Sequence, residues 1–417
     1  MKSGYTKGVH QVMHIKLFTM KYLRVLFLFI FGCNLPLSAQ QPVISRDDLH
    51  YLEGLTKAVL DSSRLLPGQF INTAYGANNT GGTLIRPGGR LTYPSFWIRD
   101  YTMSLPTGWV TAAEQKHMLL FIAGTQCDQT WITKGGSMVP YGAIADHIRI
   151  DNSVPIYFPG TYNAEEQGTE EFGRFPPYCD QFYFITMAHY YAKSTGDKKI
   201  LLEDVKGSRL IDRLERSFRV PPSRMDNHIV STTAAYRGVD FGFRDAIAIT
   251  GDLCYTSLLK YVAANELSEI FGWLQNTAKA ASYKKIALEL KKAIPAVFLT
   301  ANGMLKASTG QSAQPDVWAT AWAVYLHVLD GQEALNASRV LADAYEKGNL
   351  AYKGCIRHIL KTDDFNKNTA WENAIVPVNQ YQNGAYWGTP TGWVAYAIAR
   401  VNTGDARKLV KEYITDL

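Results

Sequence analysis

A helix that is buried on every side is predicted by the sequence Asp180-Gln-Phe-Tyr-Phe-Ile-Thr-Met-Ala-His-Tyr-Tyr191. Its apolar residues surround the helix instead of forming one stripe, and helices of this kind lie inside a shell of other helices. The sequence Asp316-Val-Trp-Ala-Thr-Ala-Trp-Ala-Val-Tyr-Leu326 has the same character. The stretches 198–216, 274–298 and 332–347 instead carry Lys, Arg and Glu on one side, which is typical of an outer layer.

Inner and outer helices alternate along most of the chain. Apolar residues spaced three to four apart predict helices over residues 45–65, 100–126, 180–195, 198–216, 250–271, 274–298, 316–329, 332–347, 390–402 and 405–416. Each inner helix and the outer helix after it would form a helical hairpin. Repetition of the pair builds an all-α closed toroid of two concentric rings. Five pairs are clear, and a sixth would lie within residues 350–375.

One domain is expected over residues 40–417, because no linker rich in Pro, Gly or Ser and no shift in composition divides it. Residues 127–178 interrupt the helices with turn and strand signals, such as His147-Ile-Arg-Ile-Asp151. Long insertions in compact domains usually carry function. We therefore expect this turn-rich and strand-rich insertion to contribute to a site.

The N-terminus has the features of a secretory signal peptide. Lys21 and Arg24 precede a short apolar run, and small residues follow up to Ala39. We predict a signal peptide over residues 1–39 and a periplasmic or secreted protein. An alternative interpretation takes Ile30-Phe-Gly-Cys33 as a lipobox, which would make the protein an outer-membrane lipoprotein anchored at Cys33. A membrane is expected as a partner only in that case.

Composition excludes several classes of protein. The 417 residues are 47% apolar and 19% charged, which excludes a disordered or coiled-coil chain. The formal net charge is +6, but five positive residues and no acidic ones lie in residues 1–39, which leaves +1 for the rest. A nucleic-acid partner needs a concentrated basic face, so none is expected. The spacing of Cys and His predicts neither a metal site nor a cofactor.

Polar and aromatic residues gather at the start of each predicted inner helix. If these helices run parallel, the gathered residues meet at one end of the ring. The candidate substrate-binding residues are Trp97, Arg99, Asp100, Gln181, Asp240, Arg244, Asp245, Asp316, Asn383, Tyr386 and Trp387. An alternative is that Asp180, Asp245 and Asp316 only cap helices, which explains neither the aromatic neighbours nor the Arg-Asp pairs. Aromatic faces pack on sugar rings, and carboxylates bind hydroxyls, so we expect a carbohydrate site.

Three segments resemble those of known glycosidases. Tyr93-Pro-Ser-Phe-Trp-Ile-Arg-Asp100 resembles the Tyr-Pro-x-x-Trp-x-Arg-Asp segment of glucoamylase-type enzymes, glycoside hydrolase family 15. Cys179-Asp-Gln-Phe-Tyr-Phe184, with Thr195-Gly-Asp197 after it, resembles a stretch of glycogen-debranching and family 63 enzymes. Gln382-Asn-Gly-Ala-Tyr-Trp-Gly-Thr-Pro-Thr-Gly-Trp393 is similar to late segments of the six-hairpin glycosidases.

The resemblance implies an (α/α)6 barrel that hydrolyses a glycosidic bond with inversion, on an α-linked glucosyl or related neutral sugar of an oligosaccharide or glycoside. Inversion needs an acid and a base roughly 6.5–9.5 Å apart. By position in the matched motifs, Asp180 corresponds to the acid, and Glu372 matches the late base. Arg99 and Asp100 would hold hydroxyls, between Trp97 and Trp387 as stacking walls.

Alternatives stay open at this point. Family 15 takes its acid from a Glu, and Gln181 stands where the debranching pattern has a small residue. Competitors for the acid are Asp240, Asp245, Glu165, Glu166, Glu170 and Glu171, the last four being otherwise a solvated charge run. Arg99, Arg237 and Arg244 would suit an unsaturated uronyl hydrolase or a polysaccharide lyase on an α/α toroid. A non-catalytic glycan-binding protein is the third possibility.

Overall fold

The computed structural model describes residues 42–71, 75–87, 93–151, 154–161, 163–168, 173–241, 244–363 and 371–417. The predicted signal peptide, Cys33, Glu170 and Glu171 lie outside the described residues. Residues Val43–Leu417 group into one compact unit, to which all elements below belong. In the described part of the chain, no helix is both long and apolar enough to cross a membrane.

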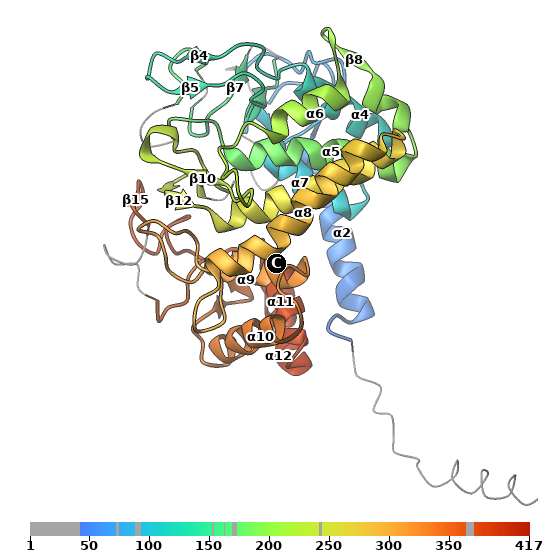
Figure 1. The fold of residues 1–417 in the computed structure, drawn as a ribbon. Helices are drawn as coiled ribbons and strands as arrows, with labels where there is room; N and C mark the ends of the chain where they lie inside the picture. The colour runs from blue at the N-terminus through green and yellow to red at the C-terminus, as the bar shows by residue number, and fades with distance from the viewer. Residues whose placement is uncertain are drawn as a thin grey trace, which may run out of the picture. The chain divides into compact units, whose positions relative to one another are not determined.

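Eleven α-helices lie within the described residues (Figure 1). They are α2 (Arg46–Ser63), α3 (Ile98–Ser104), α4 (Ala112–Ala123), α5 (Tyr178–Thr195), α6 (Leu210–Phe218), α7 (Cys254–Trp273), α8 (Thr277–Phe298), α9 (Val317–Tyr325), α10 (Gly331–Glu346), α11 (Thr391–Ala399) and α12 (Thr403–Asp416). Short 3-10 helices are η1 (Leu105–Thr107), η2 (Lys198–Leu202) and η3 (Ala234–Tyr236).

The helices form an inner and an outer set. The inner set packs in chain order, α3 on α5, α5 on α7, α7 on α9 and α9 on α11. Outer helices α6, α8, α10 and α12 each pack on the inner helix before them, whereas α4 packs on α5 and α2 packs on α12. Every residue of α9 from Val317 to Val324 is buried. The predicted alternation of inner and outer helices is therefore present.

The predicted sixth pair within residues 350–375 is wrong for the part of that range that the structure describes. Residues 350–363 hold the hairpin of β13 (Ala351–Tyr352) and β14 (Cys355–Ile356), and β15 (Asn373–Ala374) follows residue 371. A hairpin forms there because Lys353 and Gly354 both have positive φ angles, 50° and 74°. The complete six-hairpin ring stays a prediction.

The predicted helix over residues 100–126 is two helices. Pro106 lies in η1, and Gly108 ends it with a φ of 77°, a left-handed conformation that suits glycine. Thr111 then starts α4 with a capping box to Glu114. The break turns the chain from the inner set to the outer set.

The stretch predicted as a helix over residues 198–216 is also broken. It contains η2, the hairpin of β8 (Asp204–Val205) and β9 (Ser208–Arg209), and then α6. Lys206 and Gly207 form the turn of this hairpin with φ angles of 51° and 79°. Only the last part of the stretch is an α-helix.

The strands are two or three residues long and pair antiparallel. The remaining pairs are β1 (Arg64–Leu65) with β2 (Leu84–Ile85), β4 (Trp131–Ile132) with β5 (Met138–Val139), β3 (Ser95–Trp97) with β6 (His147–Arg149), β6 with β7 (Pro155–Ile156), β10 (Ser231–Thr232) with β12 (Gly251–Asp252), and β11 (Ile247–Ala248) with β15. Strands β4 to β7 lie in the insertion over residues 127–178, which has the turns and strands that the sequence predicts.

A carboxyl group is buried between α5 and α7. Glu266 is 9% exposed and accepts a hydrogen bond of 2.8 Å from Thr186. His189 Nδ1 lies 3.8 Å from Glu266, and His189 Nε2 lies 2.9 Å from Glu269. Burial raises the pKa of Glu266 to about 8, and the neighbouring Glu269 adds to the rise. The folded protein therefore holds this proton up to a higher pH than the unfolded chain.

Glu266→Gln should make stability less dependent on pH. In the wild type the stabilising protonated state is complete below the ordinary glutamate pKa, about 4.3, and is lost as pH rises towards about 8, so stability falls across this window by a few kcal/mol. Glutamine does not ionise, so that loss should disappear. Urea unfolding at pH 5 and pH 8 measures the difference, with Glu333→Gln on the exposed first turn of α10 as control. Equal pH dependence in wild type and Glu266→Gln would contradict the assignment.

Candidate functional site

Arg99 is the centre of the first cluster of charged residues. Strand β3 leads directly into α3, and its pairing with β6 sets Trp97 opposite His147. Asp146 therefore lies beside Arg99, and the two side chains form an ion pair. Arg99 Nη1 also lies 3.6 Å from Asp180 Oδ1, near the start of α5. Arg99 is 4% exposed, and both aspartates are fully buried.

The pKa values of the two aspartates beside Arg99 are shifted in opposite directions. Burial raises the pKa of Asp180 well above its usual range, opposed by Arg99 and reinforced by Asp146. Burial acts on Asp146 in the same direction, but Arg99 and a hydrogen bond of 2.7 Å from His147 hold the pKa of Asp146 below its usual range. Of the two, Asp180 is therefore the aspartate whose environment favours the carboxylic acid, and Asp146 is the one whose environment favours the carboxylate. Among the described residues, Asp180 Oδ2 has no hydrogen-bond partner.

Two further carboxyl groups complete what we call the Arg99 group: Arg99, Asp100, Asp146, Asp180 and Asp245. Burial raises the pKa of Asp245 to about 6. The charge of Arg99 opposes this rise, and that of Asp146 adds to it. The side chain of Gln382 fixes Asp245, since it donates to Asp245 Oδ1 and accepts from the backbone of Ala246. Burial also raises the pKa of Asp100, against the effect of Arg99.

Aromatic rings border this group. Trp97 stacks on His147 with 4.8 Å between ring centroids, and Tyr93 meets Trp97 edge-on at 5.2 Å. Tyr381 packs against Trp387 with 5.4 Å between ring centroids. The charge of Asp245 raises the pKa of Tyr381, and that of Arg99 lowers it. Flat rings beside carboxyl groups are what a sugar ring needs for stacking and hydroxyl binding.

A second cluster, the Arg244 group, consists of Arg244, Asp240 and Asp316. Arg244 is fully buried, lies 3.3 Å from Asp240 and forms an ion pair with Asp316. Burial raises the pKa of Asp240 to about 6, against the effect of Arg244. Arg244 and Asp245 are neighbours in the chain, so the Arg244 group and the Arg99 group adjoin each other at these two residues.

The capping alternative is correct for one of the three aspartates. Asp316 caps α9 by accepting from the backbone N–H groups of Trp318 and Ala319, at 3.0 and 3.1 Å, and it also binds Arg244. Asp180 is not a cap, since α5 begins after Pro177 without a side-chain cap. Asp245 lies outside the helices.

Buried polar atoms around Arg244 lack partners. Trp318 stacks on His358 with 3.7 Å between ring centroids, and Arg244 lies 5.3 Å from the centre of the Trp371 ring. Among the described residues, no hydrogen-bond partner exists for Arg244 Nε, Trp318 Nε1, both ring nitrogens of His358 and both amide atoms of Gln314. Buried polar atoms without partners are rare, and so many at one place are typical of a site that holds water or a ligand.

Glu372 directly precedes β15, and the pairing of β15 with β11 places it away from Asp245. The register of β11 and β15, continued by one residue, sets Glu372 opposite Ile249, four residues beyond Asp245. The carboxylate accepts from Thr250 N at 2.7 Å and from Thr250 Oγ1 at 2.8 and 2.9 Å. A Cβ atom at Gly310 would lie 2.9 Å from Glu372 Oε1, so the glycine leaves room for this carboxylate.

Two predicted binding residues make hydrogen bonds to the backbone elsewhere. Gln181 accepts from Ile144 N at 2.9 Å and donates to Pro177 O at 3.2 Å, so it ties the insertion to α5. Asn383 donates to Val376 O at 2.8 Å. The structure therefore brings neither residue to the Arg99 group.

Tyr386 and Trp387 face opposite sides of an extended segment. Trp387 pairs with Ile356 through the backbone, and its ring faces Tyr381 and Trp318. Tyr386 lies against Arg357 and Lys361, 5.7 and 5.9 Å from its ring centre, and lines a separate cavity of about 460 Å³. Successive side chains of extended chain point to opposite faces, which separates the two predicted rings.

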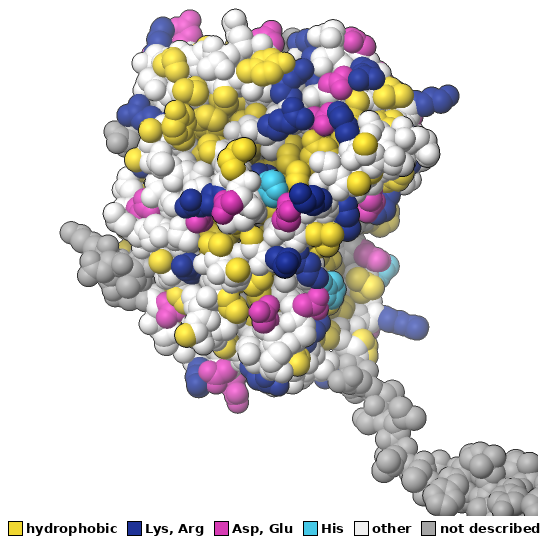
Figure 2. Space-filling view, in the orientation of Figure 1, with side chains coloured by type: hydrophobic (Ala, Val, Ile, Leu, Met, Phe, Trp, Pro, Cys, Tyr) yellow, Lys and Arg dark blue, Asp and Glu magenta, His cyan; other side chains and the backbone are white. Residues whose placement is uncertain are grey.

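The described part of the glutamate run is exposed. Glu165 is 69% exposed and forms an ion pair with Lys134, and Glu166 accepts from Asn163 at 3.1 Å. These contacts favour the solvated charge run over a lid that supplies an acid. Acidic and basic side chains are also interspersed on the face drawn in Figure 2.

Asp146, His147 and Tyr381 belong to the site but were not predicted. The only signal was the strand pattern of His147-Ile-Arg-Ile-Asp151 in an insertion expected to carry function. No group of three or more His, Cys, Asp or Glu side chains among the described residues could hold a metal ion.

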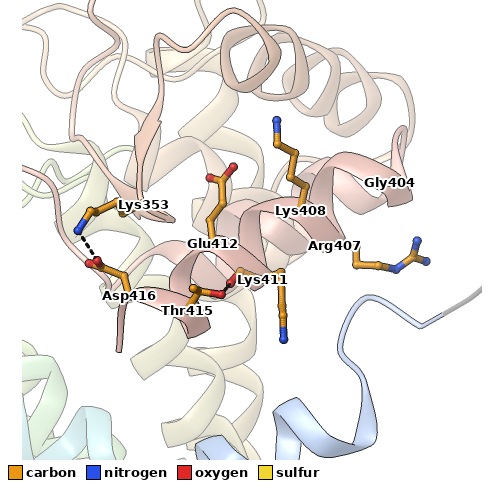
Figure 3. Close-up of a pocket in the computed structure, with 8 residues that line it drawn as sticks. All are labelled: Lys353, Gly404, Arg407, Lys408, Lys411, Glu412, Thr415 and Asp416. Carbon is orange, nitrogen blue, oxygen red and sulfur yellow. Dashed lines mark hydrogen bonds and ion pairs between the residues drawn. The ribbon is translucent and has the colours of Figure 1, made fainter.

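A surface cavity at α12 is not the site. It measures about 730 Å³ and is lined by side chains of α12 and by Lys353 (Figure 3). Lys353 pairs with Asp416 at 2.7 Å, and Lys411 pairs with Asp48 at 2.7 Å. The lining contains no aromatic ring and none of the predicted residues.

Comparisons with known proteins find a distant likeness to a solved structure. No model of a known family, including families 15 and 63, matches the sequence, and no curated protein matches it. Among solved structures the chain is similar to native alpha-L-rhamnosidase from Aspergillus terreus, with 11% identity and a TM-score of 0.45. The match covers 73% of this chain and 30% of that chain. Function is therefore inferred from the side chains of the site.

Proposed function

We propose that this chain is a glycoside hydrolase that cleaves a neutral glycoside with inversion, with Asp180 as the acid and Glu372 as the base. The observation that carries the proposal is the fully buried Asp180 beside Arg99 and Asp146, with the pKa of Asp180 raised and that of Asp146 lowered. A general acid must hold its proton at the working pH, and burial shifts the pKa of Asp180 in this direction. The rings of Trp97 and Tyr381 supply walls for a sugar.

The charge balance favours a neutral sugar over a uronate. Six aspartates lie in the Arg99 and Arg244 groups, against two arginines. Both arginines already bind aspartates, so neither side chain is held for a substrate carboxylate. A uronate would add negative charge to this surplus of carboxyl groups.

The proposed reaction takes one step. Asp180 donates its proton to the glycosidic oxygen while the bond from that oxygen to the anomeric carbon breaks. Glu372 removes a proton from the water that attacks the anomeric carbon from the opposite face. The products are an alcohol and a sugar of inverted anomeric configuration, and proton exchange with water restores Asp180 and Glu372.

Two observations support Glu372 as the base, and Asp245 is its rival. Glu372 is half-buried, so water can reach it, and Thr250 orients its carboxylate. Asp245 interacts electrostatically with Arg99 and Asp146, but Gln382 occupies one of its oxygens. Export by the predicted signal peptide is part of the same proposal, since glycans are often cleaved outside the cytoplasm.

A panel of neutral and uronate oligosaccharides tests the proposal. We expect new reducing ends from at least one neutral α-linked substrate and no ultraviolet-absorbing unsaturated product. Unsaturated products from uronates would indicate lyase chemistry. Binding by calorimetry without new reducing ends would indicate a glycan-binding protein, and either result would contradict the proposal.

A further inference from the structure

A second cavity lies where α4 ends and the insertion begins. It measures about 680 Å³, within the range of about 300–1,000 Å³ of sites for small ligands. Its walls come from the connection between α4 and β4, from β7, from the turn between β8 and β9, and from α6. It contains no residue of the Arg99 group or the Arg244 group.

One wall of this cavity is aromatic and held in place. Trp131, which is half-buried, meets the buried ring of Tyr157 edge-on with 6.4 Å between centroids. Tyr157 donates to Thr125 O at 2.7 Å, and the Cys127 thiol donates to Gln129 O at 2.9 Å. The side chains of Trp131 and Tyr157 also interact with the Cys127 thiol. These contacts fix the orientation of both rings before any ligand binds.

Polar side chains also line this cavity. Arg213 donates to Val205 O at 3.0 Å, and Lys206 donates to Gly124 O at 2.6 Å, so both cations are turned towards backbone carbonyls. Asp128 is exposed and has no hydrogen-bond partner among the described residues. The cavity therefore offers a carboxylate acceptor for hydroxyl groups, while its cations are engaged by the protein.

We propose that this cavity is a second carbohydrate site, which holds a neutral glycan apart from the Arg99 group. Aromatic rings and a carboxylate acceptor that line one cavity suit a hydroxyl-rich ring. The ligand class rests on the proposed function, because an enzyme that cleaves glycans gains from a second contact with a polymeric substrate. The cavity binds glycan without taking part in bond cleavage.

Trp131→Ala tests this site, with Trp109→Ala as a matched control, since Trp109 is a 42% exposed tryptophan outside the cavity. Affinity electrophoresis against neutral and uronate polysaccharides measures binding. Removal of an aromatic anchor should weaken binding to a neutral polysaccharide about tenfold, whereas Trp109→Ala should bind as the wild type does. Turnover of a small neutral glycoside should stay within about twofold in both variants, because the site is apart from the Arg99 group.

Asp128→Ala, a change of an exposed side chain, repeats the test if Trp131→Ala does not fold. Equal polysaccharide binding by wild type and both cavity variants would overturn the proposal, as would binding restricted to uronate polymers. A wild type that binds polysaccharide through Trp131 but cleaves no glycoside would leave this site standing and refute the proposed hydrolase. The two failures are therefore distinguishable.

Discussion

Asp180→Asn should lower the turnover of an unactivated glycoside by about 10²–10⁴-fold and leave the fold intact. The amide has nearly the same shape as the carboxylic acid, but it cannot deliver a proton to the leaving oxygen. Asp180 is fully buried, and burial raises its pKa, which favours the neutral side chain. The neutral amide suits the same environment, which is why stability should change little.

Substrates whose leaving groups differ in acidity distinguish a catalytic acid from a residue that only positions the substrate. A substrate with an acidic phenol as leaving group needs little protonation, so Asp180→Asn should recover most of its activity on it. The alkaline fall of wild-type activity, as Asp180 loses its proton, should also disappear in the variant. Asp48→Asn, a change of a surface partner of Lys411, is the control. Equal losses on good and poor leaving groups would show that Asp180 is not the acid.

Glu372→Gln should also lower turnover by about 10²–10⁴-fold, but with no recovery on activated substrates. Water must lose a proton whatever the leaving group is, so the loss should be the same on all of them. The variant should fold, because glutamine can still accept from Thr250. Binding of substrate, measured by calorimetry, should remain.

Asp245→Asn is the matched comparison for the base. If Glu372 activates the water, Asp245→Asn should lose much less activity than Glu372→Gln, and through KM more than through kcat. The reverse ranking, with Glu372→Gln near wild-type activity, would assign the base to Asp245. In that case Glu372 serves to hold the segment beside Thr250 and Gly310.

Helices were predicted well where the apolar residues follow a helical period without a break. The stretch 180–195 covers most of α5, and 274–298 contains all of α8, because burial on one or all sides leaves a clear period. The prediction over residues 100–126 was wrong because Pro106 and Gly108 end one helix inside a continuous apolar pattern. Such a break depends on two residues, and the spacing of apolar residues over a long window does not reveal it.

The site was predicted only in its local segments. Arg99, Asp100 and Asp180 were found because they lie at the starts of α3 and α5. Asp146 was missed because it reaches Arg99 through the pairing of β3 with β6, about 50 residues apart, which no local spacing reveals. Tyr381 was missed for the same reason, since it lies in a loop, where no regular spacing of residues shows which side chains come near the Arg99 group.

The anomeric configuration of the first sugar released is the measurement that tests the two-carboxylate mechanism most directly. Proton NMR, recorded on a cleavable neutral glycoside before mutarotation, distinguishes the anomers. A water molecule activated opposite Asp180 requires that an α-linked substrate release the β-anomer first. Release of the α-anomer would require a covalent intermediate and would contradict the account.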